Sequence, residues 1–311
     1  MTSLFRFRST ASILSLALGG AFASPHSLVA QATVERLNPY VTTATRTSTS
    51  TTTLGTVTDQ FSADELARYQ LNSFADAISL ATGAPVLRSG ALGGSAAIFM
   101  RGANSNQTLF LVDGLRMNDP NTDYAVMLGG AYMAACDSLE VSHGPQSTLY
   151  GGEAVGGVVS LRSQRGEGEP SEQIGIEVGS FGTVQGAVSG KGTKGATSYN
   201  FATQGGHTDN DRENNAFDSL NATLRLDHVI SDRVSVGATV RWFHGEYESP
   251  GDRYTNDPDN LENEDNLVAT VFANFRHGDE WRSHVILGGQ DRRFVSENPG
   301  PFGTSMTIVK N

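Results

Sequence analysis

Few residues of this chain are spaced as a catalytic or metal-binding site would require. Asp209, Asp211 and Asp218 lie in one short stretch and offer the hard oxygen ligands that Ca²⁺ prefers. A solvated acidic loop explains the same three residues, and we favour that interpretation over a calcium site. The stretch 190–195 has the G-x-G-x-x-G spacing of a phosphate-binding turn. No helical pattern follows it, so the sequence predicts a hairpin turn there instead.

Enzyme chemistry has no constellation of residues to support it. The seven histidines are scattered, and the sequence contains neither a His-Glu-x-x-His motif nor a Gly-x-Ser-x-Gly motif. The formal net charge of −11 provides no basic stripe that could neutralise the phosphates of a nucleic acid. Cys136 is the single cysteine, so no intramolecular disulfide can form. We therefore predict a protein that is not an enzyme, has no cofactor other than possible Ca²⁺, and binds no nucleic acid.

The N-terminal residues have the pattern of an export signal. Arg6 and Arg8 precede an apolar run that is far shorter than the ~20 residues of a transmembrane helix. Two Ala-x-Ala cleavage sites follow, at 21–23 and 30–32, and we prefer the second, which makes 1–32 a signal peptide. The alternative is a core helix of a cytosolic protein. It is weaker, because no further apolar helix follows to pack on this one.

Residues 33–165 divide into an arm and a small domain. Residues 33–58 are rich in Thr, Ser and Val and have too little apolar surface to fold alone, so we expect an extended, mobile arm and linker. Residues 59–165 have the pattern of an α+β domain. Ser62 and Glu65 form a capping-box signature for one helix, and a second helix is expected near Ser73.

The strands of this domain are short and apolar. They are expected at 96–101, 108–112, 138–141 and 157–161. The segment 108–112 is apolar on both faces, which predicts a strand buried in the middle of a sheet. Asp113-Gly114 follows it directly and is a strong hairpin-turn signal.

Beyond the linker 166–170 the chain alternates between apolar and polar residues. The clearest segments are 220–227, 234–242 and 267–276, and shorter ones occur at 174–178, 184–188, 199–203 and 281–287. Several reach roughly the 9–11 residues of a tilted transmembrane strand. We expect residues 166–311 to be antiparallel, all-β, and to form about seven strands at most of a transmembrane barrel.

A soluble β-sandwich also alternates and is the competing interpretation. Two features favour the barrel. Arg225, Asp227 and Arg241 occupy polar positions within long strands, as a wet lumen permits. The expected connections also alternate between short ones, at 191–196 and 230–232, and long polar ones, at 208–217 and 245–266.

Three stretches of the sequence carry a family resemblance. Residues 37–46 (LNPYVTTATR) resemble a TonB box with its trailing Thr-Ala-x-Arg. Residues 99–116 and 139–159 contain MRG…TLFLVDGLR and LEVSHGPQSTLYG…AVGGVV, which resemble the two plug signatures of TonB-dependent outer-membrane receptors. In this family Leu-Arg usually stands where the chain has Ser142-His143. The replacement could remove one charge contact between plug and barrel.

The resemblance implies a plug domain followed by the first strands of a plugged transmembrane β-barrel in the cell outer membrane. It implies energy-coupled uptake of a scarce, bulky nutrient, driven by the TonB energy-transducing protein in the periplasm. An extended arm can add as a strand to the sheet edge of such a partner. The residues expected to bind TonB are Leu37, Pro39, Tyr40, Val41, Thr42, Thr43 and Ala44.

Ligand contacts are expected from two loops at the outer apex of the plug, 88–95 and 118–127. The candidates are Arg88, Leu92, Asn118, Asp119, Asp123 and Tyr124, with ordinary solvated loops as the alternative. The chain looks most like the cobalamin receptors, whose loops can bind calcium, and ferric siderophore receptors come next. A passive outer-membrane pore or a secreted β-sandwich binding protein is the competing function.

The expected barrel is incomplete. Plugged transporters close at ~22 strands, whereas residues 166–311 offer about seven. An open sheet edge has no partners for its amides in lipid. We therefore expect this chain to be a truncated, N-terminal portion of a barrel that cannot transport anything alone.

Overall fold

The computed structural model describes residues 40–46, 48–69, 71, 73–118, 131, 137–251, 254, 256–278, 281–300 and 303–310. The chain divides into two units, 1–37 and 38–311, and all described residues belong to the second. The expected signal peptide, 1–32, lies outside them. Among the described residues, no helix is both long and apolar enough to cross a membrane.

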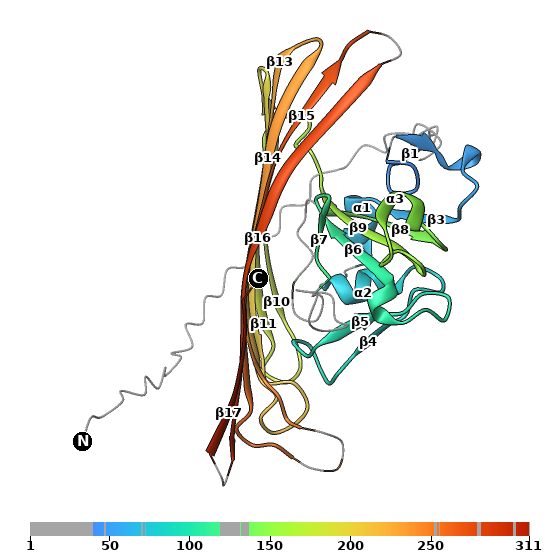
Figure 1. The fold of residues 1–311 in the computed structure, drawn as a ribbon. Coiled ribbons are helices and arrows are strands. Elements are labelled where there is room, and N and C mark those ends of the chain that lie inside the picture. The colour runs from blue at the N-terminus through green and yellow to red at the C-terminus, as the bar shows by residue number, and fades with distance from the viewer. Residues whose placement is uncertain are drawn as a thin grey trace, which may run out of the picture. The chain divides into compact units, whose positions relative to one another are not determined.

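Residues 58–163 contain a small α+β domain, here called the plug. Its five-stranded sheet has the order β3 (Thr58–Phe61), β8 (Asp137–His143), β9 (Gly157–Ser163), β6 (Thr108–Val112) and β7 (Leu115–Arg116). Only β6 and β9 pair in parallel. The helices are α1 (Ala63–Arg68), α2 (Phe74–Ser79) and α3 (Ser147–Tyr150). Phe74, Phe110 and Leu139 are fully buried, so α2 packs on the sheet through an apolar core (Figure 1).

Local sequence signals of the plug are confirmed. Ser62 caps α1 by accepting from the Glu65 amide at 3.3 Å, and the Glu65 carboxylate accepts from the Ser62 amide at 3.0 Å. Strand β6 is buried throughout. Asp113 and Gly114 have φ of +48° and +87°, as the tight turn between β6 and β7 requires.

Two expectations for the plug need correction. The strand expected over 96–101 is shorter, β5 (Ala96–Ile98), and pairs with β4 (Val86–Arg88) outside the main sheet. The cause is a turn at Arg101-Gly102, where φ is +50° and +76°. The arm is also not extended from residue 40 onward. Strand β1 (Tyr40–Val41) pairs with β2 (Thr49–Ser50), and a 3₁₀ turn, η1 (Thr51–Thr53), follows.

The remaining residues form one eight-stranded antiparallel sheet in which each strand pairs with the next. Its strands are β10 (Ser171–Val178), β11 (Val184–Lys194), β12 (Thr197–Thr208), β13 (Phe217–Ser231), β14 (Val234–Glu248), β15 (Leu261–Arg276), β16 (Arg282–Gly300) and β17 (Gly303–Lys310). Eight strands exceed the seven expected, because β17 pairs with the far half of β16, where apolar alternation is weak.

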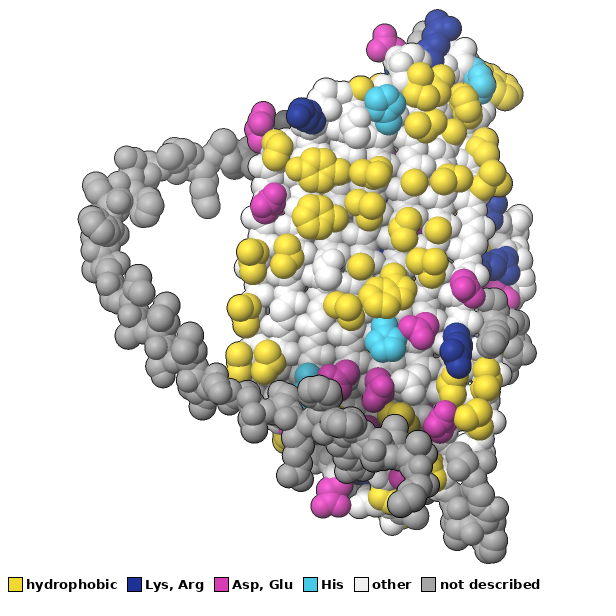
Figure 2. All heavy atoms as spheres, turned by 90° about the vertical axis from the view of Figure 1, so that its left-hand side faces the viewer, with side chains coloured by type: hydrophobic (Ala, Val, Ile, Leu, Met, Phe, Trp, Pro, Cys, Tyr) yellow, Lys and Arg dark blue, Asp and Glu magenta, His cyan; other side chains and the backbone are white. Residues whose placement is uncertain are grey.

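The two faces of this sheet differ in polarity. Ile176 and Leu287 are 80% and 68% exposed, whereas Arg241 and Asn266 are 2% and 0% exposed. Figure 2 shows the exposed face, on which rows of apolar side chains cross several strands. A soluble β-sandwich has the reverse arrangement, with apolar side chains inward. The sheet therefore has an apolar outer face and a polar inner face, as a barrel wall in lipid does.

Four successive connections of the sheet, from β11 to β15, alternate in length. Residues 195–196 and 232–233 make tight turns at one end, while 209–216 and 249–260 make long connections at the other. The hairpin turn expected over 190–195 comes later than predicted, because β11 continues to Lys194 and the chain turns at Gly195, with φ of +60°.

Candidate functional site

A buried ionic cluster joins the plug to the inner face of the sheet. Arg241 of β14 donates from Nε to Asp113 Oδ2 at 3.0 Å, and its guanidinium also bonds Asp137 of β8. Ser163 joins the cluster, because its amide and hydroxyl donate to Asp113 at 2.7 and 2.9 Å. The side chains of Arg241 and both aspartates are at most 5% exposed. One cation thus serves two buried carboxylates from different parts of the plug.

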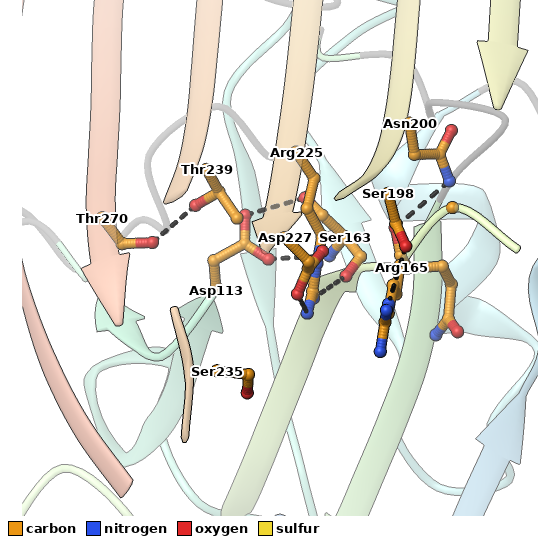
Figure 3. Close-up of polar contacts among 12 residues, drawn as sticks. Asp113, Ser163, Arg165, Ser198, Asn200, Arg225, Asp227, Ser235, Thr239 and Thr270 are labelled. Atoms are coloured by element: carbon orange, nitrogen blue, oxygen red, sulfur yellow. Dashed lines mark hydrogen bonds and ion pairs between the residues drawn. The ribbon is translucent and has the colours of Figure 1, made fainter. Parts of the chain in front are cut away.

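A second set of contacts fixes the C-terminal end of the plug (Figure 3). Arg225 of β13 donates to the Ser163 carbonyl and pairs with Asp227 at 2.8 Å. Arg165 donates to Ser198 at 3.1 Å, and the Asn200 amide donates to the carbonyl of Gln164 at 3.1 Å. Several polar positions of β12 and β13 therefore hold the end of the plug and the residues that follow it.

Sequence reasoning missed this cluster. From the sequence, Asp113 is expected only to make a turn, and Arg241 only to face a wet lumen. The expected loss of a charge contact at Ser142-His143 stays a prediction; in this chain His143 lies inside the plug. Its Nε2 contacts Asp59 Oδ2 at 2.9 Å, so the position faces β3 rather than the barrel.

The loop 88–95 contacts the end of the sheet that carries the long connections. Leu92 packs on Phe217 and Tyr247, and Asn210 donates to the Leu92 carbonyl at 3.2 Å. A Cβ added at Gly93 would lie 2.5 Å from the Phe217 ring, so the contact leaves no room for a larger residue. This end of the plug is thus packed closely against the ends of β13 and β14, and we call residues 88–95 the wedged loop.

The candidate ligand residues divide into three groups. Arg88 points back into the plug and donates to Ser73 Oγ at 3.1 Å. Asn118 pairs with the backbone of β6, accepting from Phe110 N at 2.8 Å and donating to Thr108 O at 2.9 Å. Leu92 lies in the wedged loop, where it packs on Phe217 and Tyr247. Asp119, Asp123 and Tyr124 lie outside the described residues, and ligand binding by the six remains a prediction.

The three candidate calcium ligands do not converge. Asp209 and Asp218 contact opposite nitrogens of His207, at 3.2 and 2.9 Å. Asp211 instead accepts from Asn215 Nδ2 at 3.1 Å. Within the described part of the chain, no group of three or more His, Cys, Asp or Glu could hold a metal ion. Calcium binding remains a prediction that these contacts do not favour.

The arm is fastened to the plug through Glu140, a residue of β8 that is 6% exposed. Its carboxylate accepts from the amides of Thr42 and Thr43 at 3.1 and 2.8 Å and from both of their hydroxyls. Tyr150 donates from its hydroxyl to the Thr43 carbonyl at 2.8 Å, and the Arg46 guanidinium lies 4.6 Å from its ring centre. We call this set of contacts the clasp.

Burial raises the pKa of the Tyr150 hydroxyl, and the nearby Arg46 charge opposes that rise. Of the residues expected to bind TonB, Thr43 and Ala44 are buried in or beside the clasp. Tyr40 and Val41 pair with β2, while Leu37 and Pro39 lie outside the described residues. Glu140 was not among the candidates, although a charged residue between Leu139 and Val141 in an apolar strand was the available signal.

Residues 49–158 match the family model described as the TonB-dependent receptor plug domain. The chain is 29% identical over 255 residues to the vitamin B12 transporter BtuB of Vibrio vulnificus, covering 78% of this chain and 41% of the relative. It is 28% identical over 245 residues to the same transporter of Vibrio cholerae, covering 74% and 39%. The chain thus spans about two fifths of the curated relatives it matches.

Solved structures show the same fold at lower identity. The ferric yersiniabactin uptake receptor FyuA of Yersinia pestis aligns with a TM-score of 0.65 and 17% identity, over 79% of this chain and 42% of that one. The alcaligin outer-membrane receptor FauA of Bordetella pertussis aligns with a TM-score of 0.67 and 15% identity, over 84% and 44%. These likenesses concern the arrangement of plug and strands.

Proposed function

This chain belongs to the TonB-dependent receptors, and we propose that its receptor takes up a scarce, bulky nutrient across the outer membrane, driven by a TonB energy-transducing protein. Its plug is followed by eight strands of the wall of a plugged barrel. The observation that carries the proposal is that the two faces of this wall have different roles. Its outer face is apolar and exposed, and its inner face holds the plug through Arg241 and Arg225.

Cobalamin is the ligand class that we propose first. The sequence relatives that cover most of this chain are vitamin B12 transporters. A ferric siderophore is the second candidate. Receptors for iron chelates share the fold at 13–17% identity, which supports the architecture and says nothing of the ligand.

The relatives are transport receptors, not enzymes, and they support the proposals for the partner and the location that follow. We propose that a segment within residues 37–44 adds as a strand to the periplasmic partner, that 1–32 is a cleaved export signal, and that the apolar face of the sheet contacts outer-membrane lipid. The wedged loop 88–95 lies at the end with the long connections, where a ligand from outside would arrive.

Deletion of residues 37–45 tests the energy coupling. Uptake of labelled nutrient by cells carrying the receptor should be lost, while binding of the same nutrient to isolated outer membranes persists. Unchanged uptake would favour a passive pore. Binding should be measured with cyanocobalamin and with a ferric catecholate in parallel, because saturable binding of only one of them identifies the ligand class.

A further inference from the structure

Strand β8 is held at two points by groups outside the plug sheet. Glu140 accepts four hydrogen bonds from Thr42 and Thr43 of the arm. Asp137, three residues earlier on the strand, pairs with Arg241 of the barrel wall. Side chains alternate along a strand, so these two carboxylates point to opposite faces of the sheet. The arm and the wall are therefore joined through a single strand.

We propose that Glu140 is a positioning residue that transfers a pull on the arm to β8, and that Asp137–Arg241 is the contact between plug and wall that this pull loads. The inference rests on the proposed function and deepens it, because it names the route by which work enters the plug. A partner that grips the arm on the N-terminal side of Thr42 loads the clasp before any later residue.

The covalent route from arm to plug is longer and weaker. From Ala44 the chain runs through β2 and η1 to β3, which starts at Thr58. Strand β3 lies at the edge of the plug sheet and pairs with β8 over four residues. An edge strand loaded at its end loses its hydrogen bonds one after another. Strand β8 lies between β3 and β9 and pairs with β9 over seven residues, so its bonds share the load.

The clasp is strong enough to serve as the first load-bearing point. Hydrogen bonds to a charged acceptor are roughly twice as strong as neutral ones, and the Glu140 carboxylate is buried. The Tyr150 hydroxyl holds the Thr43 carbonyl, so both backbone groups of Thr43 are used. Strand addition by a partner would need those same groups, which confines the grip to residues before the clasp.

Single-molecule pulling tests this route. The lipid-embedded receptor is pulled by a handle attached before residue 40, with no nutrient present. In Glu140→Ala, residues 44–57 should extend before the plug bears force. This adds roughly 45 Å of extension at ~3.4 Å per residue. Ser142→Ala is the matched control. It lies on the same strand and loses a 3.2 Å contact with Thr58, yet should keep the wild-type trace.

A double-mutant comparison tests the second half of the proposal. Asp137→Asn should lower the force at which the plug separates from the wall when Glu140 is present. In the Glu140→Ala background, Asp137→Asn should leave the first event, the extension of residues 44–57, unchanged. Tyr150→Phe, which keeps the fold of β8, should lower the force of clasp opening.

Identical traces for wild type, Glu140→Ala and Tyr150→Phe would overturn the proposal. Failure of the proposed function would be detected by the nutrient binding and uptake measurements, which are independent of the pulling traces.

Discussion

The plug and the barrel wall are both β-sheet structures, but they sort their side chains in opposite ways. Strand β6 of the plug is apolar and buried on both faces. Strand β14 of the wall exposes Val240 and Trp242 and buries Thr239 and Arg241. The difference fits the proposed location of the wall, since lipid accepts apolar side chains on the outside and a wet interior accepts polar ones. The polar residues of the wall therefore lie on its inner face, and two of them, Arg241 and Arg225, hold the plug.

Removal of Arg241, the cation between the plug and the wall, should have the largest effect on stability. Arg241→Ala removes the cation that pairs with the buried carboxylates of Asp113 and Asp137. Loss of one partner from a buried ion pair costs about 3–5 kcal/mol. Urea unfolding of the plug in detergent micelles should show this loss. Arg233→Ala, at an exposed turn, should change the unfolding free energy by no more than about 0.5 kcal/mol; an equal loss there would contradict the assignment.

The apolar outer face is tested by placing a charge on it. Val271 is 55% exposed in the middle of β15. Arginine at a lipid-facing midplane position costs about 2–4 kcal/mol, so Val271→Arg should lower stability in bilayers by that order. Val271→Leu should be close to neutral. If both variants unfold alike from lipid vesicles, this face does not contact the hydrocarbon.

The wedge of the plug against the wall is tested at Gly93. Gly93→Ala brings a Cβ within 2.5 Å of the Phe217 ring at a φ of +101°, and overpacking of this kind costs about 1–3 kcal/mol. Gly83→Ala has a φ of +80° but nothing within 4 Å, so it reports the backbone strain alone. Thermal unfolding should separate the two variants. Equal melting temperatures would show that the loop moves aside freely.

The smallest expected effect is the pH dependence of the clasp. Burial raises the pKa of Tyr150 above its ordinary value of 10.0, so the folded form holds the phenol proton more tightly. This contribution is present below pH 10 and is lost as the pH rises through the folded pKa. One hydrogen bond contributes about 0.5–1.5 kcal/mol. A spin label at exposed Ser48 should become more mobile in that alkaline range, and Tyr150→Phe should remove the transition.

The features that sequence reasoning found are local ones. The Ser62 cap, the buried strand 108–112 and the Asp113-Gly114 turn each depend on neighbouring residues, and the structure confirms all three. The alternating strands were found because the two faces of the wall differ in polarity. Their ends were not, since pairing with a neighbouring strand extends β11 beyond its own apolar pattern.

The contacts that matter most for function join residues far apart in the chain. Arg241 and Asp113 are 128 positions apart, and Glu140 and Thr43 are 97 apart. The residues that flank Asp113 in the sequence give no sign that its carboxylate also bonds Arg241. The clue at Glu140 was its charge within an apolar strand, but the group that would satisfy that charge could not be named from sequence.

The short segment between plug and wall has a consequence for how an opening can form. Gln164 and Arg165 are bonded to Asn200 and Ser198, and a Cβ at Gly166 would lie 1.8 Å from the Tyr199 carbonyl oxygen. The chain at this corner of the plug is therefore held by β12, the third strand of the wall. We therefore expect any displacement of the plug relative to the wall to be smallest at this corner and largest in the parts of the plug farthest from it.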